Sequence, residues 1–276
     1  MNRLWTFIKS IYGISIGIIS FLFNFMPESF FAYGFMNVDW SRDVIIFSNR
    51  ILLLFAISLV TTAVVYLCRK YRKKETIRGN DYTVRVEYED IMNVTGCKRV
   101  ISFDECYTTK IGKAPQDINE DSICGQYLRK NPIPDISRLI SQAGVTPAAK
   151  PSKYKSQPRY TSGTIVPRGD DLLLAFVPLD ENGSGSFDSI ADYMESLSRL
   201  WCELDKHHGQ KDVCISILGS GTTRVSDSTE KYSQQELLDL MILSYKKSRH
   251  KLQSNSTLRI ICQRNDNFSL NNIGVR

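Results

Sequence analysis

One stretch of the sequence has residue types suited to binding phosphate. From Ile215 to Arg224 it reads Ile-Ser-Ile-Leu-Gly-Ser-Gly-Thr-Thr-Arg, so an apolar run typical of a strand ends in a loop of small residues. Glycines let backbone N–H groups approach phosphate oxygens closely, and ligands of open α/β sheets lie beyond the carboxyl ends of strands. The run predicts a phosphate-binding loop, while a tight turn without a ligand uses the same residues.

The cysteines and histidines show no spacing typical of a metal site. The sequence contains seven cysteines, an odd number, without a CxxC pair. They are Cys68, Cys97, Cys106, Cys124, Cys202, Cys214 and Cys262. We interpret them as reduced thiols of a cytoplasmic domain. His207 and His208 are adjacent on a predicted helix, so they do not both face one metal ion. We therefore expect neither a metal ion nor a cofactor.

The N-terminal region has the composition of membrane helices. Residues 10–26 and 51–68 contain no charged residue, and apolar neighbours extend them to spans at about 5–26 and 47–68. Both approach the roughly 20 residues that cross the hydrocarbon core. Residues 1–75 are predicted to form a two-helix transmembrane hairpin. Two buried core helices or a signal peptide would give a similar pattern, although no small-x-small cleavage site follows Met26.

Basic residues at the span ends predict the orientation. Arg3 and Lys9 precede the first span, and a basic cluster of residues 69–74 follows the second. Lys and Arg are retained on the cytoplasmic side, so both termini should be cytoplasmic, with residues 27–49 as a short outer loop. The formal net charge of +6 is concentrated beside the apolar segment, which favours lipid headgroups over nucleic acid. Gly13 and Gly17 form a GxxxG pattern, which mediates helix association or arises by chance.

After the second span, strands and helices are predicted to alternate, which is the pattern of an α/β fold. Apolar, β-rich runs occupy residues 82–88, 98–103, 172–177, 213–218 and 258–263. We assign residues 76–276 to one domain that begins with a linker at 76–81. Residues 144–158 lack periodicity and are predicted to form a mobile surface loop.

Two helices are predicted between these strands. Apolar residues recur at helical spacing from Ile190 to Leu204. A capping box of Ser233 and Glu236 opens the second helix. Its predicted buried face contains Leu237, Leu240, Met241 and Tyr245.

The order of these motifs resembles a macro domain, which binds ADP-ribose. It is closer still to the macro domains of bacterial Thoeris membrane effectors, where two transmembrane helices precede a macro domain that senses a nucleotide made by a TIR-domain enzyme. The motifs that carry the resemblance are Asp90-Ile91 and residues 100–105, 122–125, 160–164 and 218–224. The resemblance implies a three-layer α/β/α domain with a mixed sheet.

The resemblance also implies a set of ligand-binding residues. Asp90 would accept a hydrogen bond from the adenine amino group, and Ile91 would contribute its backbone N–H. Two loops would surround the diphosphate. The first contains Ser122, Cys124 and Gly125, and the second contains Gly219, Ser220 and Gly221.

The sequence departs from the broader macro pattern at two places. The asparagine-rich motif of hydrolytic members is replaced by Asp104-Glu105-Cys106-Tyr107, so we expect no catalytic residues, with Asp104 as a ligand contact. After the second loop, macro domains usually have an aromatic residue and a glycine. In this sequence Thr223 and Arg224 occupy those positions, and Thr222 precedes them. Thr222, Thr223 and Arg224 are counted with the ligand-binding residues, and the last two would open room for a substituent on the distal ribose. Arg224 would pair with a diphosphate or with a carboxylate on that substituent, or remain a solvated surface arginine.

The resemblance implies a membrane effector of antiviral defence rather than an enzyme. An ADP-ribose-derived signal, such as histidine-ADP-ribose, would drive homo-oligomerisation and membrane disruption, and a TIR-domain enzyme would be the functional partner. The alternative is a membrane-tethered ADP-ribosyl hydrolase, with Asp104 or Glu105 as the base. A membrane-bound RNA-binding domain is a third reading, but the basic residues of the 144–158 loop lack an aromatic platform beyond Tyr154 and Tyr160.

Overall fold

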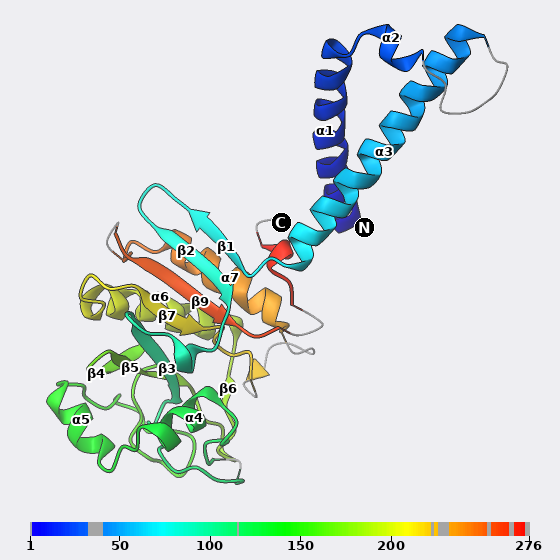
Figure 1. The fold of residues 1–276 in the computed structure, drawn as a ribbon. Helices are drawn as coiled ribbons and strands as arrows, with labels where there is room; N and C mark the ends of the chain where they lie inside the picture. Colours follow the sequence, from blue (N-terminus) through cyan, green and yellow to red (C-terminus); the bar gives the residue numbers. More distant parts are fainter. Residues whose placement is uncertain are drawn as a thin grey trace. The chain divides into compact units, whose positions relative to one another are not determined.

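The computed structural model describes residues 2–32, 41–114, 116–221, 224–225, 232–252, 255–264 and 268–273 (Figure 1). The chain divides between Arg72 and Lys73 into two compact units. The first unit contains the N-terminal helices, and the second is the α/β domain. The division lies three residues before the predicted start of the domain at residue 76.

The N-terminal unit consists of helices. They are α1 (Asn2–Phe25), α2 (Glu28–Phe31) and α3 (Arg42–Lys70). Within α3, the Thr61 hydroxyl donates to the Ile57 carbonyl at 2.7 Å. Asn49 Nδ2 donates to the Phe31 carbonyl at 2.8 Å and joins α3 to α2. Such internal partners are required wherever lipid replaces water.

Helix α3 has the length and composition of a membrane span. It has 29 residues, its most apolar stretch has a mean hydropathy of 2.6, and large side chains such as Phe55 and Leu59 are exposed. The apolar stretch of α1, Tyr12–Phe21, is shorter. Among the described helices only α3 meets the criteria of a span, so the first span at about 5–26, and with it the two-helix hairpin, stays a prediction. The predicted outer loop is wrong at its end because α3 begins at Arg42, and residues 33–40 lie outside the described residues.

A seven-stranded sheet forms the centre of the domain, in the order β1-β2-β9-β7-β3-β5-β4. The strands are β1 (Lys74–Arg78), β2 (Thr83–Tyr88), β3 (Lys98–Asp104), β4 (Thr164–Arg168), β5 (Asp171–Val177), β7 (Val213–Ser216) and β9 (Thr257–Cys262). The inner neighbours β2, β9, β7, β3 and β5 are parallel. The edge strands β1 and β4 are antiparallel to their neighbours. The predicted mixed sheet is therefore confirmed.

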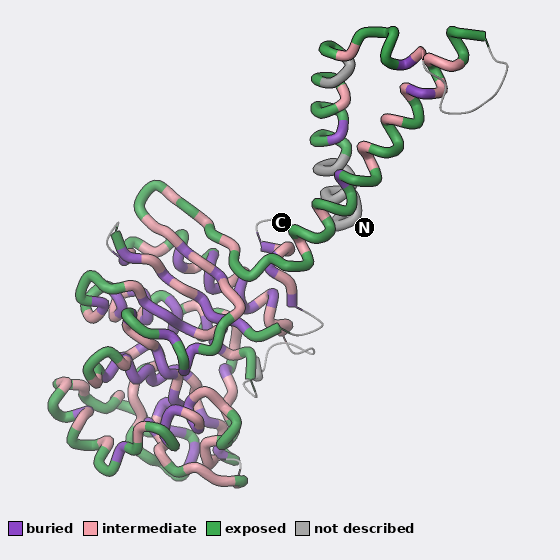
Figure 2. Tube along the Cα trace, in the orientation of Figure 1, coloured by how far each residue is buried: buried purple, intermediate pink, exposed green. Residues whose placement is uncertain are grey.

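Helices cover both faces of the sheet. They are α4 (Ile123–Lys130), α5 (Ile136–Gln142), α6 (Ile190–His207) and α7 (Gln234–Lys247), with short 3-10 turns η1 (Ile91–Asn93) and η2 (Leu270–Asn272). Along β5, Leu172 and Leu174 belong to the core under α6 and α7, whereas Leu173 and Ala175 belong to the core under α4 and α5. Buried strands between exposed helix faces are visible in Figure 2. Because a strand turns successive side chains to opposite faces, this alternation produces three layers.

Two predicted boundaries and one predicted surface loop differ from the structure. The linker at 76–81 is wrong at its start because β1 extends to Arg78 and pairs with β2. The strand predicted at 213–218 ends at Ser216. The stretch 144–158 contains no helix or strand, but Ser152 and Tyr154 are buried in it, so it is packed against the domain rather than purely superficial.

We expect the buried leucines of α6 to contribute strongly to the stability of the domain. Leu200 is fully buried against the sheet, so Leu200→Ala should lower the free energy of unfolding by about 2–5 kcal/mol through the cavity it leaves. Leu243 on α7 is 48% exposed, so Leu243→Ala should change it by less than about 0.5 kcal/mol. Urea unfolding of residues 73–276, followed by circular dichroism, measures both. Equal losses would contradict this assignment of the core.

Candidate functional site

The predicted ligand-binding residues gather at one edge of the sheet. Parallel strands end on the same side, so Asp90 after β2, Asp104 at the end of β3 and the loop 217–221 after β7 share the carboxyl edge. The turn η1 packs against both α4 and β7, which brings Asp90 and Ile91 toward the loops. This is the edge at which open α/β sheets bind ligands.

Asp90 caps the η1 turn. Its Oδ1 accepts from the Met92 N–H at 2.9 Å, and its Oδ2 accepts from Asn93 Nδ2 at 3.0 Å. The side chain is exposed, and a carboxylate has about four lone-pair sites, so it retains acceptor capacity for a ligand amino group. Ile91 is 2% exposed, and its side chain packs in the core below.

The first predicted loop is the amino end of α4. The Ser122 hydroxyl accepts from the Gly125 N–H at 3.0 Å and donates to the Asn119 carbonyl at 2.6 Å. A Cβ on Gly125 would lie 2.2 Å from that Asn119 oxygen. The glycine is therefore required by packing within the chain, and its N–H is already bonded. The N–H groups of Ile123 and Cys124 remain at the positive end of the helix, where a helix has no internal acceptors for them.

Asp104 is buried at the carboxyl edge, at the end of β3. It is 7% exposed, and its Oδ1 accepts from the Cys106 N–H at 2.8 Å and the Thr108 N–H at 3.1 Å. Burial raises the pKa of Asp104, against the effect of these hydrogen bonds. Burial, followed by the charge of Asp104, also raises the pKa of Cys124 well above its usual range. The structure therefore brings Asp104 and Cys124 together, and neither environment favours charge.

The residues after Asp104 are engaged in structural contacts that sequence reasoning did not find. Glu105 is 2% exposed; it accepts from the Ser152 hydroxyl at 2.5 Å and pairs with Arg159 at 3.4 Å. These contacts hold the 144–158 stretch against β3. Burial, followed by the charge of Asp104, raises the pKa of Cys106 to about 11, so this thiol is protonated at neutral pH and is not an activated nucleophile.

The second predicted loop is fixed by α6 and α7. The Tyr193 hydroxyl donates to the Leu218 carbonyl at 3.1 Å, and the Leu218 N–H donates to Met241 Sδ at 3.3 Å. Gly219 has a φ of +76°, a conformation that favours glycine. The Ser220 hydroxyl donates to the Ile217 carbonyl at 2.7 Å and closes the turn.

Gly221 is the exposed glycine of this loop. A Cβ built on it meets nothing within 4 Å, so no packing within the described chain requires a glycine there. Thr222 and Thr223 lie outside the described residues. Arg224 belongs to the short strand β8 (Arg224–Val225), which pairs with β6 (Ser186–Phe187). Among the described residues, no group of three or more His, Cys, Asp or Glu is placed to hold a metal ion.

A family model settles the relationship of the domain to known proteins. The model described as Thoeris protein ThsA, Macro domain, matches residues 84–263, which is well over half of the chain. The chain belongs to the Thoeris ThsA macro-domain family. The matched segment begins in β2 and ends just after β9, so it contains every strand of the carboxyl edge.

Individual ThsA and macro-domain proteins are also similar. Thoeris protein ThsA of Bacillus amyloliquefaciens (strain Y2) is 26% identical over 247 residues, which cover 86% of this chain and 80% of that protein. A mutant Oceanobacillus iheyensis macrodomain has a TM-score of 0.46 at 8% identity, covering 71% of this chain and 93% of that chain. The structure titled as that macrodomain with ADP has a TM-score of 0.39 at 10% identity, covering 69% and 89%.

The buried Asp104 carboxyl of this ThsA-type domain should make stability depend on pH. Because its pKa is raised on folding, the folded protein holds the proton more tightly, and the resulting stabilisation is lost as pH rises from about 3.9 through the raised pKa. Asp104→Asn retains an acceptor oxygen for the turn but does not titrate. Its stability relative to the parent should therefore increase from pH 4 to pH 8, as measured by urea unfolding across that range. A constant difference would mean that the carboxyl does not titrate differently on folding.

Proposed function

We propose that this protein is a membrane effector of antiviral defence that senses an ADP-ribose-derived nucleotide, such as histidine-ADP-ribose, made by a TIR-domain enzyme. The nucleotide binds to the cytoplasmic domain and triggers homo-oligomerisation and disruption of the bacterial inner membrane, in which both termini face the cytoplasm. The observation that carries the proposal is the match to the ThsA macro-domain family over residues 84–263. The composition of α3 supports the membrane part.

The geometry of the carboxyl edge supports nucleotide binding. Asp90 is exposed and retains acceptor capacity for an adenine amino group. Gly221 is exposed without a packing requirement, which allows the backbone to approach a diphosphate. The helix α4 packs against β3 and η1, and its amino end offers N–H groups and the positive end of the helix dipole to an anion.

Binding without turnover is favoured by the contacts of Asp104 and Glu105. A general base needs a carboxylate that reaches a water molecule beside the ligand. Glu105 is buried and engaged by Ser152 and Arg159, and Asp104 caps its own turn. The alternative, an ADP-ribosyl hydrolase, predicts steady conversion of ligand. Chromatography of histidine-ADP-ribose recovered after long incubation with the protein separates the two functions.

Ligand binding must favour the assembled state for the signal to act. A ligand shifts an equilibrium only by its differential affinity for the two states, so the nucleotide has to bind the oligomer more tightly than the monomer. Anchoring confines the domains to a plane and raises their effective concentration. A modest ligand-dependent contact between domains is then sufficient to rearrange the attached helices.

Gly221→Glu should abolish nucleotide binding while the domain stays folded. The added carboxylate would lie near the phosphates, and two like charges about 4 Å apart repel by about 4 kcal/mol at an effective dielectric of 20. We expect the affinity for histidine-ADP-ribose to fall at least a hundredfold in calorimetric titration. The open space at Gly221 leaves the fold intact, which circular dichroism checks.

Gly221→Gln is the matched control, because it has nearly the same size without the charge. It should weaken binding less than Gly221→Glu, so the difference between the two variants measures the repulsion from phosphate. If folded Gly221→Glu binds as tightly as the parent, the loop is only a turn and the assignment of the diphosphate site is wrong.

The membrane unit should be required for toxicity but not for binding. Deleting residues 1–68 removes α1 and almost all of α3 but leaves the α/β domain, which is a separate compact unit. In cells that express an active TIR-domain enzyme, the full chain should stop growth and the truncated chain should not. Calorimetry should give the same affinity for both proteins. A truncated protein that is equally toxic would remove the membrane from the mechanism.

A further inference from the structure

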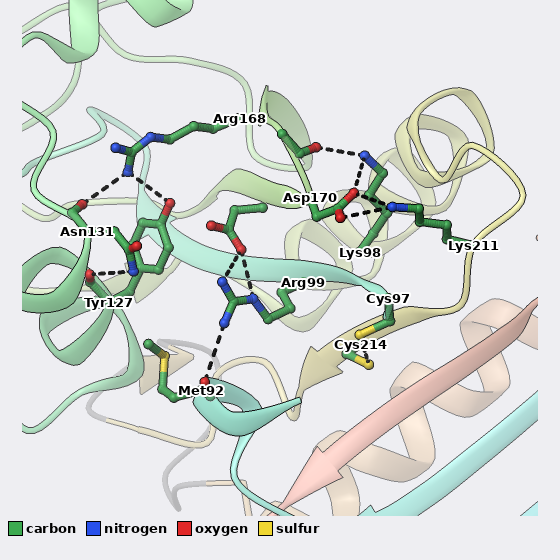
Figure 3. Close-up of polar contacts among 12 residues, drawn as sticks. Met92, Cys97, Lys98, Arg99, Tyr127, Asn131, Arg168, Asp170, Lys211 and Cys214 are labelled. Atoms are coloured by element: carbon green, nitrogen blue, oxygen red, sulfur yellow. Dashed lines mark hydrogen bonds and ion pairs between the residues drawn. The ribbon is translucent and has the colours of Figure 1, made fainter. Parts of the chain in front are cut away.

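Two cysteines from distant parts of the sequence lie in contact at the amino edge of the sheet, opposite the candidate site. Cys97 directly precedes β3, and Cys214 is the second residue of β7. Their Sγ atoms are 2.7 Å apart, and the two residues are separated by 117 positions. Figure 3 shows both sulfur atoms directed toward one another below Arg99 and Lys98.

The sheet register places the two thiols on the same face. Arg99 is paired with Cys214 in the parallel β3–β7 ladder. Side chains two residues apart on a strand share a face, so Cys97 lies on the face of Arg99 and therefore of Cys214. A disulfide bond is about 2.05 Å long, so the two sulfur atoms need to approach by only about 0.7 Å to form one.

The surroundings assign different roles to the two thiols. The hydrogen bond from Cys214, together with the nearby charges of Arg259 and Arg99, lowers the pKa of Cys97 against the effect of burial. The contact with Cys97, followed by burial, raises the pKa of Cys214. Each arginine is held in place by a carboxylate: Arg259 by Glu87 at 2.5 Å and Arg99 by Asp171 at 2.7 Å. Cys97 therefore has the greater thiolate character, which makes it the nucleophile.

The other described cysteines with resolved pKa shifts lack this environment. Burial raises the pKa of Cys106, Cys124 and Cys262. Cys97 is 4% exposed and directly follows the exposed residues Thr95 and Gly96, whereas Cys214 is fully buried. A small oxidant therefore reaches Cys97 first.

We propose that Cys97 and Cys214 form a peroxide-oxidisable dithiol that closes to a disulfide between β3 and β7. The Cys97 thiolate attacks one oxygen of hydrogen peroxide, the O–O bond breaks, and hydroxide leaves and takes up a proton as water. Cys97 is now a sulfenic acid. The Cys214 sulfur then attacks the Cys97 sulfur, the S–O bond breaks, and a second water leaves with the Cys214 proton. Two thiols and one peroxide give one disulfide and two waters.

The disulfide would covalently link β3 and β7, the two strands whose carboxyl ends lead into the candidate site. The far end of β3 is Asp104, and β7 leads into the Gly219 loop. The bond would close a loop of more than a hundred residues, which restricts the unfolded chain strongly. The inference is independent of the proposed nucleotide, because it concerns the opposite edge of the sheet.

The test uses the full chain in detergent, treated with hydrogen peroxide under native conditions, blocked with N-ethylmaleimide and digested with trypsin. Mass spectrometry should find residues 86–98 linked to residues 212–224, with the mass of two hydrogen atoms lost and the link cleaved by dithiothreitol. The oxidised protein should melt at least about 5 °C higher than the reduced protein. A linked peptide without a rise in melting temperature would show that the bond forms only in opened molecules, and would contradict the proposal.

Serine variants test whether Cys97 and Cys214 are the two cysteines that form the disulfide. Cys97→Ser and Cys214→Ser should each abolish the linked peptide and the thermal shift, whereas Cys262→Ser, at a buried cysteine on β9, should leave both unchanged. The wild-type peptide map decides the question even if a variant fails to fold. Absence of the linked peptide in oxidised wild-type protein, or a link that joins Cys97 to another cysteine, would overturn the inference.

Discussion

Burial of both faces of the central sheet is the constraint on which the domain depends. Five inner strands are parallel, and such strands must be covered on both sides because their connections cross over the faces. Leu172, Leu173 and Leu174 are each fully buried, although they point alternately to the two helical layers. Polar side chains that could bind a ligand are therefore found at the ends of the strands rather than on the faces of the sheet.

At the carboxyl edge, the polar groups of the backbone need hydrogen-bond partners within the chain before the edge can bind a ligand. Asp90, Asp104, Ser122 and Ser220 each use a side-chain oxygen in a turn or helix cap. This capping holds the loops in defined positions, so their backbone is arranged before a ligand arrives, and less conformational freedom is lost on binding. Many residues that resemble ligand contacts in sequence therefore act first as structural caps.

Neighbouring carboxylates can have different roles at this edge. Among the described residues, Asp104 accepts from N–H groups of its own turn, and burial disfavours its charge. Glu105, the next residue, is more buried, but its charge is compensated. It forms an ion pair with Arg159 and accepts hydrogen bonds from the Ser152 hydroxyl and the Leu179 N–H. A buried charge is tolerated when it is paired and hydrogen-bonded, so Glu105 joins three segments of the chain. Its removal would leave Arg159 and Ser152 without this partner.

The sequence by itself determined the local elements. The runs at 82–88, 98–103, 172–177 and 258–263, the capping box of Ser233 and the apolar character of α3 are all found in the structure, because periodicity and caps depend on neighbouring residues. The helix α4 was missed, since its eight residues are too short for a clear periodic signal.

Only the tertiary structure decided the strand order, in which the C-terminal β9 lies between β2 and β7. It also decided that Gly125 lies against the Asn119 carbonyl oxygen, that the Glu105 carboxylate accepts from Ser152, and that Cys97 contacts Cys214. These contacts join residues whose separation in sequence has no periodic signature. They exist because the sheet register and the crossovers bring particular side chains to the same place, and no local pattern encodes that register.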